Sequence, residues 1–224
     1  MPTASLILAS ASPRRRELLE RIGFSLRLVT ADIDEMPLPG EMPIDYTKRM
    51  AREKGLAAMR RLMATAYPDD QGARRGFVSG NLPARGPGEE PARWILGADT
   101  IVAIDDVLLG KPTDEQEAHE MIHRLSGREH RVITGFSLFD LRRNKEGLQA
   151  VTTFVRFKRM SRAEIENYVA MGESMDKAGA YGIQGIGAYL VEEIRGSYTN
   201  VVGLPLCQVT EMMHEMGAAE ILPV

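Results

Sequence analysis

The stretch SLILASASPRRRELLERIG, residues 5–23, places a strand, a short polar loop and a helix in immediate succession. Its start is an apolar run after Ser5, which is typical of a buried β-strand. Ser12 suits the N-cap of the following helix, and Pro13 suits its first position. Gly23 suits the residue just beyond the helix end. A strand that leads directly into a helix favours an α/β fold.

Strands and helices alternate along the rest of the chain. Further strands are expected at residues 25–30, 94–104, 131–141, 148–160 and 188–194, and further helices are expected to begin at Pro43, Thr113, Ser161 and Pro205. Thr113 with Gln116, and Ser161 with Glu164, have capping-box spacing. A polar turn joins residues 131–141 to residues 148–160, which predicts an antiparallel pair. The fold class is therefore α/β, with a mixed, extended β-sheet flanked by helices.

Residues 65–93 differ in composition from the rest of the chain. Glycine and proline recur within this stretch, and few apolar residues interrupt it. Such a segment is too poor in apolar side chains to pack as a regular element. We interpret residues 1–224 as a single domain that carries residues 65–93 as an inserted surface loop.

Charge and composition exclude several functional classes. The formal net charge is −3, so no whole-protein basic field attracts nucleic acid. Cys207 is the only cysteine and cannot form an intramolecular disulfide; its apolar neighbours predict a buried side chain. No segment has the roughly 18 apolar residues of a membrane span. The arginines follow the first apolar run, the reverse of a signal peptide, so we expect a cytoplasmic protein without membrane contact.

A phosphate site is expected where the first predicted strand meets its helix. Arg14, Arg15 and Arg16 occupy the first helical turn, where cations oppose the helix dipole by ~0.3–1 kcal/mol each. A bound anion would compensate, because helix N–H groups and arginine forks both favour phosphate. The serines of the preceding loop, including Ser10, add hydroxyl groups. The alternative is a solvated basic turn.

Acidic and basic residues elsewhere suggest a metal site and further anion contacts. Asp99 lies inside an apolar strand, where a carboxylate is seldom buried unless it is paired or binds a metal. Together with Glu35 it could hold Mg²⁺, which takes one or two carboxylates plus phosphate oxygens. Lys54 and Lys111 are candidate phosphate contacts, although a lone lysine is usually a surface residue. Gly110 and Pro112 would fix a turn that aims Lys111.

Two other motifs are less informative about chemistry. The glycine-rich stretch 176–187 lets backbone approach a ligand, but its glycine order is not the dinucleotide-binding fingerprint. His119 and His123 match the H-E-x-x-H pattern of zinc proteases. At helical spacing both point away from the apolar stripe of their helix, toward solvent where no cleft is expected. A solvated helix face is therefore the favoured interpretation.

Seven motifs, in order, make the chain similar to the Maf family of nucleotide pyrophosphatases. They are Ser10–Arg15, Glu35, Ala51–Lys54, Ala98–Thr100, Gly110–Pro112, Asp176–Gly185 and Val202–Pro205. The resemblance implies an ITPase-like fold with two lobes around a deep cleft, and commonly a homodimer. It also implies hydrolysis of nucleoside triphosphates between the α- and β-phosphates with Mg²⁺ or Mn²⁺. The insertion at residues 65–93 is longer than is usual for the family.

The resemblance also assigns roles to single residues. Asp99 matches the catalytic aspartate and, with Glu35, the metal ligands; the phosphate-binding positions are Ser10, Arg15, Lys54, Lys111 and Lys177. Arg14, Thr100 and Gln184 match the positions that separate the branches, and here they are those of the dTTP and UTP branch. The expected activity is a house-cleaning dTTP/UTP pyrophosphatase. Alternatives are a pyrophosphatase for modified purine or other non-canonical triphosphates, and a nucleotide-binding regulator of septum formation.

Overall fold

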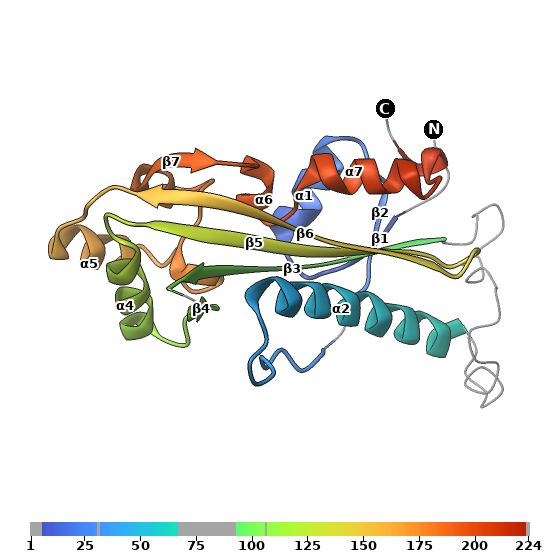
Figure 1. The fold of residues 1–224 in the computed structure, drawn as a ribbon, viewed down its shortest axis with the longest axis horizontal. Helices are drawn as coiled ribbons and strands as arrows, with labels where there is room; N and C mark the ends of the chain where they lie inside the picture. The colour runs from blue at the N-terminus through green and yellow to red at the C-terminus, as the bar shows by residue number, and fades with distance from the viewer. Residues whose placement is uncertain (1–5, 31, 67–92, 106, 223–224) are drawn as a thin grey trace.

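The computed structural model describes residues 6–30, 32–66, 93–105 and 107–222, which build a single mixed sheet with helices on both faces (Figure 1). Its strands are β1 (Leu6–Ala9), β2 (Leu26–Leu28), β3 (Trp94–Ile104), β4 (Val107–Leu109), β5 (Glu129–Asp140), β6 (Lys145–Phe157) and β7 (Val191–Arg195). The helices are α1 (Pro13–Arg21), α2 (Pro43–Ala66), α4 (Glu115–Leu125), α5 (Arg162–Ala170), α6 (Tyr198–Val202) and α7 (Leu206–Glu215). The predicted α/β class with a mixed sheet is confirmed.

The sheet combines a short parallel part with a long antiparallel part. The strand order is β2-β1-β3-β5-β6-β7, and β4 pairs with β3 beside this path. Strand β1 runs parallel to both β2 and β3, whereas β3, β5, β6 and β7 pair antiparallel. The long strands β5 and β6 extend well beyond β1, so the sheet is elongated (Figure 1).

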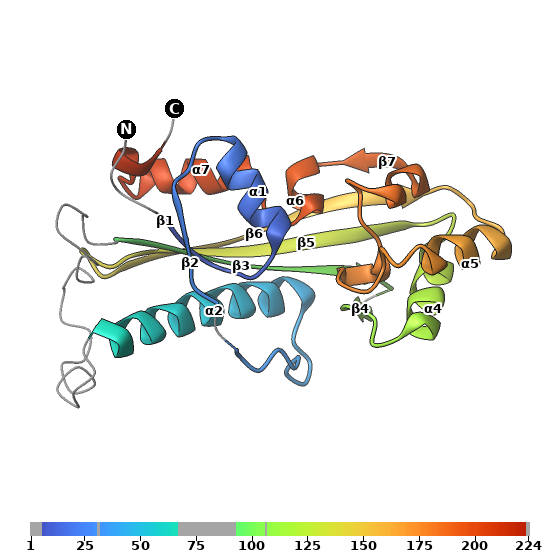
Figure 2. The same ribbon diagram turned by 180° about the vertical axis from the view of Figure 1, so that it is seen from behind.

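The helices bury opposite faces of the central strands. Helix α2 covers one face, and α1, α6 and α7 lie on the other, as both views show (Figures 1 and 2). Alternation along β3 matches this arrangement. Ile95 and Ile101 pack with α2 residues, whereas Leu96 and Ala98 pack with residues of α1 and α7. By the same alternation Asp99 faces α2, and Thr100 faces the other layer.

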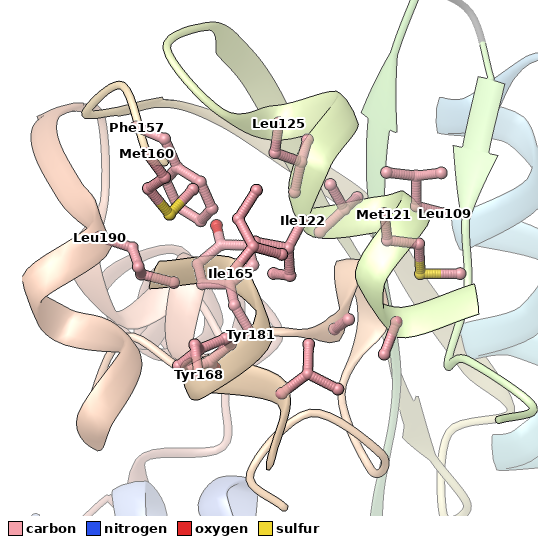
Figure 3. Close-up of a cluster of buried hydrophobic side chains, with 14 of the residues drawn as sticks. Leu109, Met121, Ile122, Leu125, Phe157, Met160, Ile165, Tyr168, Tyr181 and Leu190 are labelled. Atoms are coloured by element: carbon pink, nitrogen blue, oxygen red, sulfur yellow. The ribbon is translucent and has the colours of Figure 1, made fainter. Parts of the chain in front are cut away.

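A further hydrophobic cluster closes the far end of the sheet, where α4 and α5 meet (Figure 3). Ile122 and Leu125 of α4 pack there with Phe157 at the end of β6, and with Tyr168 and Tyr181. The predicted apolar stripe of α4 is buried, as expected from its helical spacing. Among the described residues, no helix is both long and apolar enough to cross a lipid bilayer.

Three glycines let α2 lie unusually close to the sheet. A Cβ atom on Gly97 would stand 2.2 Å from the Ala51 carbonyl oxygen, and one on Gly135 would stand 2.3 Å from that of Thr47. On the helix side, a Cβ on Gly55 would meet the Phe139 ring at 2.4 Å. Any side chain at these positions would push the helix away from β3 and β5. The register of α2 over Asp99 thus depends on glycine.

We expect Gly135→Ala to lower the free energy of unfolding by roughly 1–3 kcal/mol and to reduce activity. The added methyl group would meet backbone atoms of Thr47 and Lys48, which cannot rotate aside. Urea unfolding would measure the loss. Gly110→Ala is the stability control, because no atom of the described residues, its two chain neighbours aside, lies within 4 Å of the place that its methyl group would take. Equal stability of the two variants would contradict the close approach of α2.

Some predicted boundaries are wrong for local reasons. The N-cap of α4 lies one residue later than expected, because Asp114 rather than Thr113 caps the helix and accepts from the Glu117 backbone N–H at 2.8 Å. Thr113 instead donates both its backbone N–H and its hydroxyl to the Glu117 carboxylate. Gln116 therefore does not complete a capping box. The box predicted at Ser161 and Glu164 is present.

Other differences concern short elements and the proposed loop. Strand β4 and helix α6 were not expected, and residues 188–190 form a 3₁₀ turn before β7. Thr65 continues α2, and Arg93 is anchored to the Asp140 carboxylate at 2.6 Å. Residues 67–92, which make up the rest of the proposed loop, lie outside the described residues. Cys207 is exposed rather than buried, because α7 turns the opposite side, with Val209 and Met213, toward the core.

Candidate active site

The predicted site residues from distant parts of the chain line one cavity of about 900 Å³. They are Ser10, Arg14, Arg15, Glu35, Lys54, Asp99, Thr100, Lys111, Lys177 and Gln184. The cavity forms where β3, on the edge away from β5, lacks a neighbour in the described sheet. Strand β1 pairs with β3 up to Gly97, and β4 pairs with it only from Val102. Ligand sites in α/β sheets favour such places beyond the carboxyl end of a strand.

Two carboxylates converge on one ammonium group in this cavity. Lys54 Nζ lies 2.6 Å from Asp99 Oδ1 and 2.8 Å from Glu35 Oε1. The side chain of Asp99 is 10% exposed and that of Glu35 is 58% exposed. The first carboxylate is therefore fixed in the interior, and the second faces the solvent side of the site.

Helix α2 explains why these three groups meet. Ala51 rests on Gly97, and Lys54 lies about one turn later, which carries its side chain over the neighbouring Asp99. Tyr46, also on α2, donates its hydroxyl to the backbone carbonyl of Glu35 at 2.8 Å. Burial and the nearby carboxylates of Asp99 and Glu35 raise the pKa of Tyr46 to about 12. The phenol is therefore protonated at neutral pH and remains a donor.

The side chain of Arg15 is buried and makes several hydrogen bonds, rather than lying exposed to solvent. Its guanidinium donates to the carbonyl oxygens of Gly203 and Ala98, both at 2.8 Å, to Ser10 Oγ at 3.0 Å and to Thr100 Oγ1 at 2.8 Å. Burial lowers the pKa of Arg15, and the Asp99 carboxylate acts in the opposite direction. These contacts join the first loop, β3 and the end of α6.

The other two arginines of the first turn also have protein partners. Arg16 pairs with Glu20 at 2.7 Å along the exposed side of α1. Arg14 pairs with Asp176 at 3.1 Å across the cavity. Protein groups thus supply the compensation that was expected from a bound anion, and of the three arginines Arg14 and Arg15 line the cavity.

Asp176 links two cations of the cavity lining. Besides Arg14, its carboxylate contacts Lys177 Nζ at 2.5 Å, and that ammonium also donates to the Glu173 carbonyl at 2.6 Å. Burial would raise the pKa of Asp176, but the hydrogen bonds from Lys177 and Arg14 outweigh it and lower the pKa. The positively charged groups of Arg14 and Lys177 are therefore held in place by the ionised carboxylate of Asp176.

The three branch-specific positions differ in how free their polar groups are. Thr100 Oγ1 accepts from Arg15, lies 2.9 Å from Thr134 Oγ1 and lies 3.3 Å from the Gly203 carbonyl. A hydroxyl has one donor and two acceptor sites, so these contacts nearly saturate it. Gln184 is exposed in the cavity lining and makes no hydrogen bond with the part of the chain that the structure describes. Its amide is available to a ligand.

Lys111 stands apart from the other cations. It is exposed at the cavity, and within the described ranges it makes no ion pair. Its turn is anchored, because the Gly110 carbonyl accepts from the Gly179 N–H at 3.0 Å. Lys111 is thus an unpaired positive charge at the mouth of the site.

The donor set fits a hard divalent cation. Asp99 and Glu35 already share one cationic group, so both carboxylates can reach the same ligand position. No group of three or more His, Cys, Asp or Glu residues is arranged to hold a metal among the described residues. Mg²⁺ or Mn²⁺ would therefore need phosphate oxygens or water to complete its coordination, as is usual for Mg²⁺ at nucleotide sites.

The H-E-x-x-H histidines lie away from this cavity. His119 and His123, on α4, line a second hollow of about 1130 Å³ bounded by α4, β4 and α5. The expectation of no cleft there was wrong, because β4 and α5 rise on either side of the helix. Within the described residues the hollow supplies no third metal ligand for the pair.

Sequence reasoning assigned no role to several residues that organise the site. Tyr46 appears in the sequence only as an apolar position of α2, and Glu41 and Arg49 look like ordinary surface charges. Asp176 was noted within its motif without a function. A buried Tyr46 near two carboxylates could not be inferred before α2 was placed on the sheet. The prior signals in the sequence were the glycines at 55, 97 and 135, which permit that placement.

Comparisons with known proteins agree with this geometry. The family model described as Maf-like protein matches residues 5–216. The dTTP/UTP pyrophosphatase of Geobacter sp. (strain M21) is 45% identical over 218 residues, which cover 97% of this chain and 98% of that protein. The dTTP/UTP pyrophosphatase of Clostridioides difficile (strain 630) is 43% identical and covers 93% of each chain. With the family model matching nearly its whole length and its motif residues gathered around one cavity, this chain belongs to the Maf family.

Proposed function

We propose that this protein hydrolyses dTTP and UTP to the monophosphate and pyrophosphate. The observation that carries the proposal is the contact of Lys54 with both Asp99 and Glu35, inside a cavity lined by every predicted site residue. A pair of carboxylates beside clustered cations suits phosphoanhydride cleavage. The names of the similar proteins from Geobacter and Clostridioides support the choice of substrate.

Asp99 is the proposed base. It is buried on β3, so its carboxylate is held in one place, beside the ammonium group of Lys54. In the proposed mechanism it orients a water molecule toward the α-phosphorus and accepts its proton. The bond from that phosphorus to the bridging oxygen then breaks, and pyrophosphate leaves.

The cations around the cavity are proposed to stabilise the triphosphate. Lys54, Lys111 and Lys177 all line the cavity. Ser10 offers a hydroxyl near the start of α1, and Arg15 holds that loop in place through its hydrogen bonds. Positive charge fixed near the leaving group lowers the barrier, because negative charge develops there during cleavage.

Glu35 and Asp99 are the proposed ligands of Mg²⁺ or Mn²⁺. Such an ion polarises a phosphate oxygen and lowers the pKa of bound water. Glu35 faces the open side of the cavity, so it can reach an ion that enters together with the nucleotide. Removal of divalent cations with a chelator is therefore expected to abolish turnover.

Gln184 is proposed to bind the base edge directly. A glutamine amide both donates and accepts, and so can meet the O2, N3–H and O4 edge of uracil or thymine. Arg14 lies across the same cavity and is held by Asp176. Thr100 is engaged by Arg15 and Thr134, so its influence on selectivity is proposed to act through that network.

We expect Gln184→Glu to lower kcat/KM for both dTTP and UTP by roughly 10- to 100-fold, because a carboxylate cannot donate and buried polar groups would go unpaired. Steady-state rates with dTTP, UTP, CTP, GTP and 7-methyl-GTP would measure this. CTP should be the weaker pyrimidine substrate, since its 4-amino group reverses part of the hydrogen-bond pattern. Unchanged rates and ranking in Gln184→Glu would show that this side chain does not read the base.

The same nucleotide panel tests the proposed function. Pyrophosphate release by the wild-type protein should be fastest with dTTP and UTP and should require Mg²⁺ or Mn²⁺. Preference for 7-methyl-GTP would assign the protein to the purine branch. Nucleotide binding without turnover would favour the regulatory alternative.

The remaining expectations are also proposals. From the family resemblance we propose a homodimer in the cytoplasm, with each chain acting as a single domain and two lobes flanking the cavity. Light scattering coupled to gel filtration would test the dimer. A monomer at the protein concentration of the assay, with full activity, would exclude it.

A further inference from the structure

Apart from Ile33, which is partly buried against the core, the segment that carries Glu35 is not held by burial. Residues 32–42 connect β2 to α2 without forming a helix or strand. Three large apolar side chains in it are mostly exposed: Met36 by 72%, Leu38 by 55% and Met42 by 59%. A segment with so few buried apolar contacts tends to open locally. Some other interaction must fix the Glu35 carboxylate next to Lys54.

An ion pair supplies the first part of that anchor. Arg49 of α2 meets the Glu41 carboxylate with two hydrogen bonds, Nε to Oε1 and Nη2 to Oε2, both at 2.6 Å. The side chain of Glu41 is only 9% exposed. Such two-point arginine–carboxylate pairs fix direction as well as distance.

The same two side chains also hold the backbone of the segment. Arg49 Nη2 donates to the Met36 carbonyl at 3.0 Å, directly after Glu35. Glu41 Oε2 accepts from the Leu38 N–H at 3.0 Å. Opening this pair would therefore release the backbone on the carboxyl side of Glu35.

Tyr46 supplies the second part of the anchor that holds Glu35. Its hydroxyl holds the carbonyl of Glu35 itself, and the Arg49 guanidinium lies 5.5 Å from the centre of its ring. Both residues belong to α2, the helix that also carries Lys54. One helix thus holds the backbone carbonyl of Glu35, the carbonyl of the next residue and the Glu35 carboxylate.

We propose that the Glu41–Arg49 ion pair, with Tyr46, is a positioning element that holds Glu35 for the divalent cation and so sets the cation affinity of the site. This rests on the proposed function, because it assigns Glu35 to the metal. None of the three side chains needs to touch the cation or the nucleotide. Groups that orient a metal ligand typically change metal affinity by about 10- to 100-fold when they are lost.

The test compares Arg49→Met with Arg52→Met. Arg52 is on the same helix and also pairs with a carboxylate, but that carboxylate belongs to Glu146 of β6 rather than to the 32–42 segment. Its Nε alone contacts both oxygens, at 2.8 and 3.0 Å. The probe is Mn²⁺ with α,β-imido-UTP, and bound Mn²⁺ is followed by electron paramagnetic resonance. Hydrogen–deuterium exchange of residues 32–42, without nucleotide, is the second readout.

We expect Arg49→Met to weaken Mn²⁺ binding at least about tenfold and to speed exchange in residues 35–42. The Mn²⁺ concentration for half-maximal dTTP hydrolysis should rise, whereas kcat at saturating Mn²⁺ should change less than about threefold. Arg49→Lys should recover part of the affinity, because lysine keeps the charge but not the two-point geometry. Arg52→Met should match the wild type in every measurement.

If Arg49→Met does not fold, Glu41→Gln tests whether the ion pair positions Glu35, since glutamine keeps the size of the side chain and removes its charge. Unchanged Mn²⁺ affinity and unchanged exchange in Glu41→Gln would overturn the proposal. So would equal effects of Arg49→Met and Arg52→Met. If the wild type hydrolyses neither dTTP nor UTP, the proposed function fails separately, and the exchange data still decide whether this pair holds the segment.

Discussion

Asp99→Asn is expected to lower kcat for dTTP and UTP by roughly 10²- to 10⁴-fold while leaving the protein folded. Asparagine has nearly the same size, and its carbonyl oxygen can still accept from Lys54, which lies 2.6 Å from Asp99 in the native protein. It cannot accept the proton of an attacking water, and it is a poorer ligand for a divalent cation. Pyrophosphate release and circular dichroism would separate the loss of chemistry from a loss of fold.

Asp32→Asn is the matched control for this experiment. Asp32 also lines the cavity, but it is exposed and has no hydrogen bond or ion pair with the described residues. Its replacement should change kcat less than about tenfold, because a solvated carboxylate contributes little to a fixed site. A folded Asp99→Asn protein with the rate of Asp32→Asn would rule out Asp99 as the base.

Local sequence signals predicted most of the fold. Ser12 and Pro13 mark the start of α1 as expected, and the apolar run at residues 94–104 is the strand β3. The short elements could not be predicted from the sequence, because they form only through contacts with residues far away in the chain. Strand β4 has three residues and exists only through its pairing with β3, and α6 is a single short helix capped by Ser197. No periodicity can be read from segments of that length.

It was easier to predict which residues line the cavity than which contacts they make there. The predicted site residues lie in the first turn of α1, within α2 and β3, or in the loops between elements, and all of them line the cavity beside β3. Whether a given cation is free or already paired depends on tertiary packing. Arg14, Arg15 and Arg16 are neighbours with similar sequence environments, yet one reaches Asp176, one is buried and one pairs along its own helix.

The burial of Arg15 leads to a second prediction, which concerns the stability of the fold. Arg15 is 7% exposed and makes four hydrogen bonds, two of them to the buried main chain of β3 and the end of α6. Removing a donor from a buried acceptor costs about 1–3 kcal/mol for each group left unpaired. The lowered pKa of Arg15 shows that burying its charge is itself unfavourable, so a neutral side chain recovers part of this cost.

We therefore expect Arg15→Met to reduce the free energy of unfolding by about 3 kcal/mol, and the melting temperature by on the order of 10 °C. Arg16→Met, one residue away, should cost less than about 1 kcal/mol, because its pair with Glu20 is exposed. Urea unfolding of both variants, with Arg15→Lys as an intermediate that keeps the charge, would measure the difference. If the two methionine variants were equally stable while only Arg15→Met lost activity, Arg15 would act on the substrate's phosphates directly, and the loop at Ser10 would have to be held by other contacts.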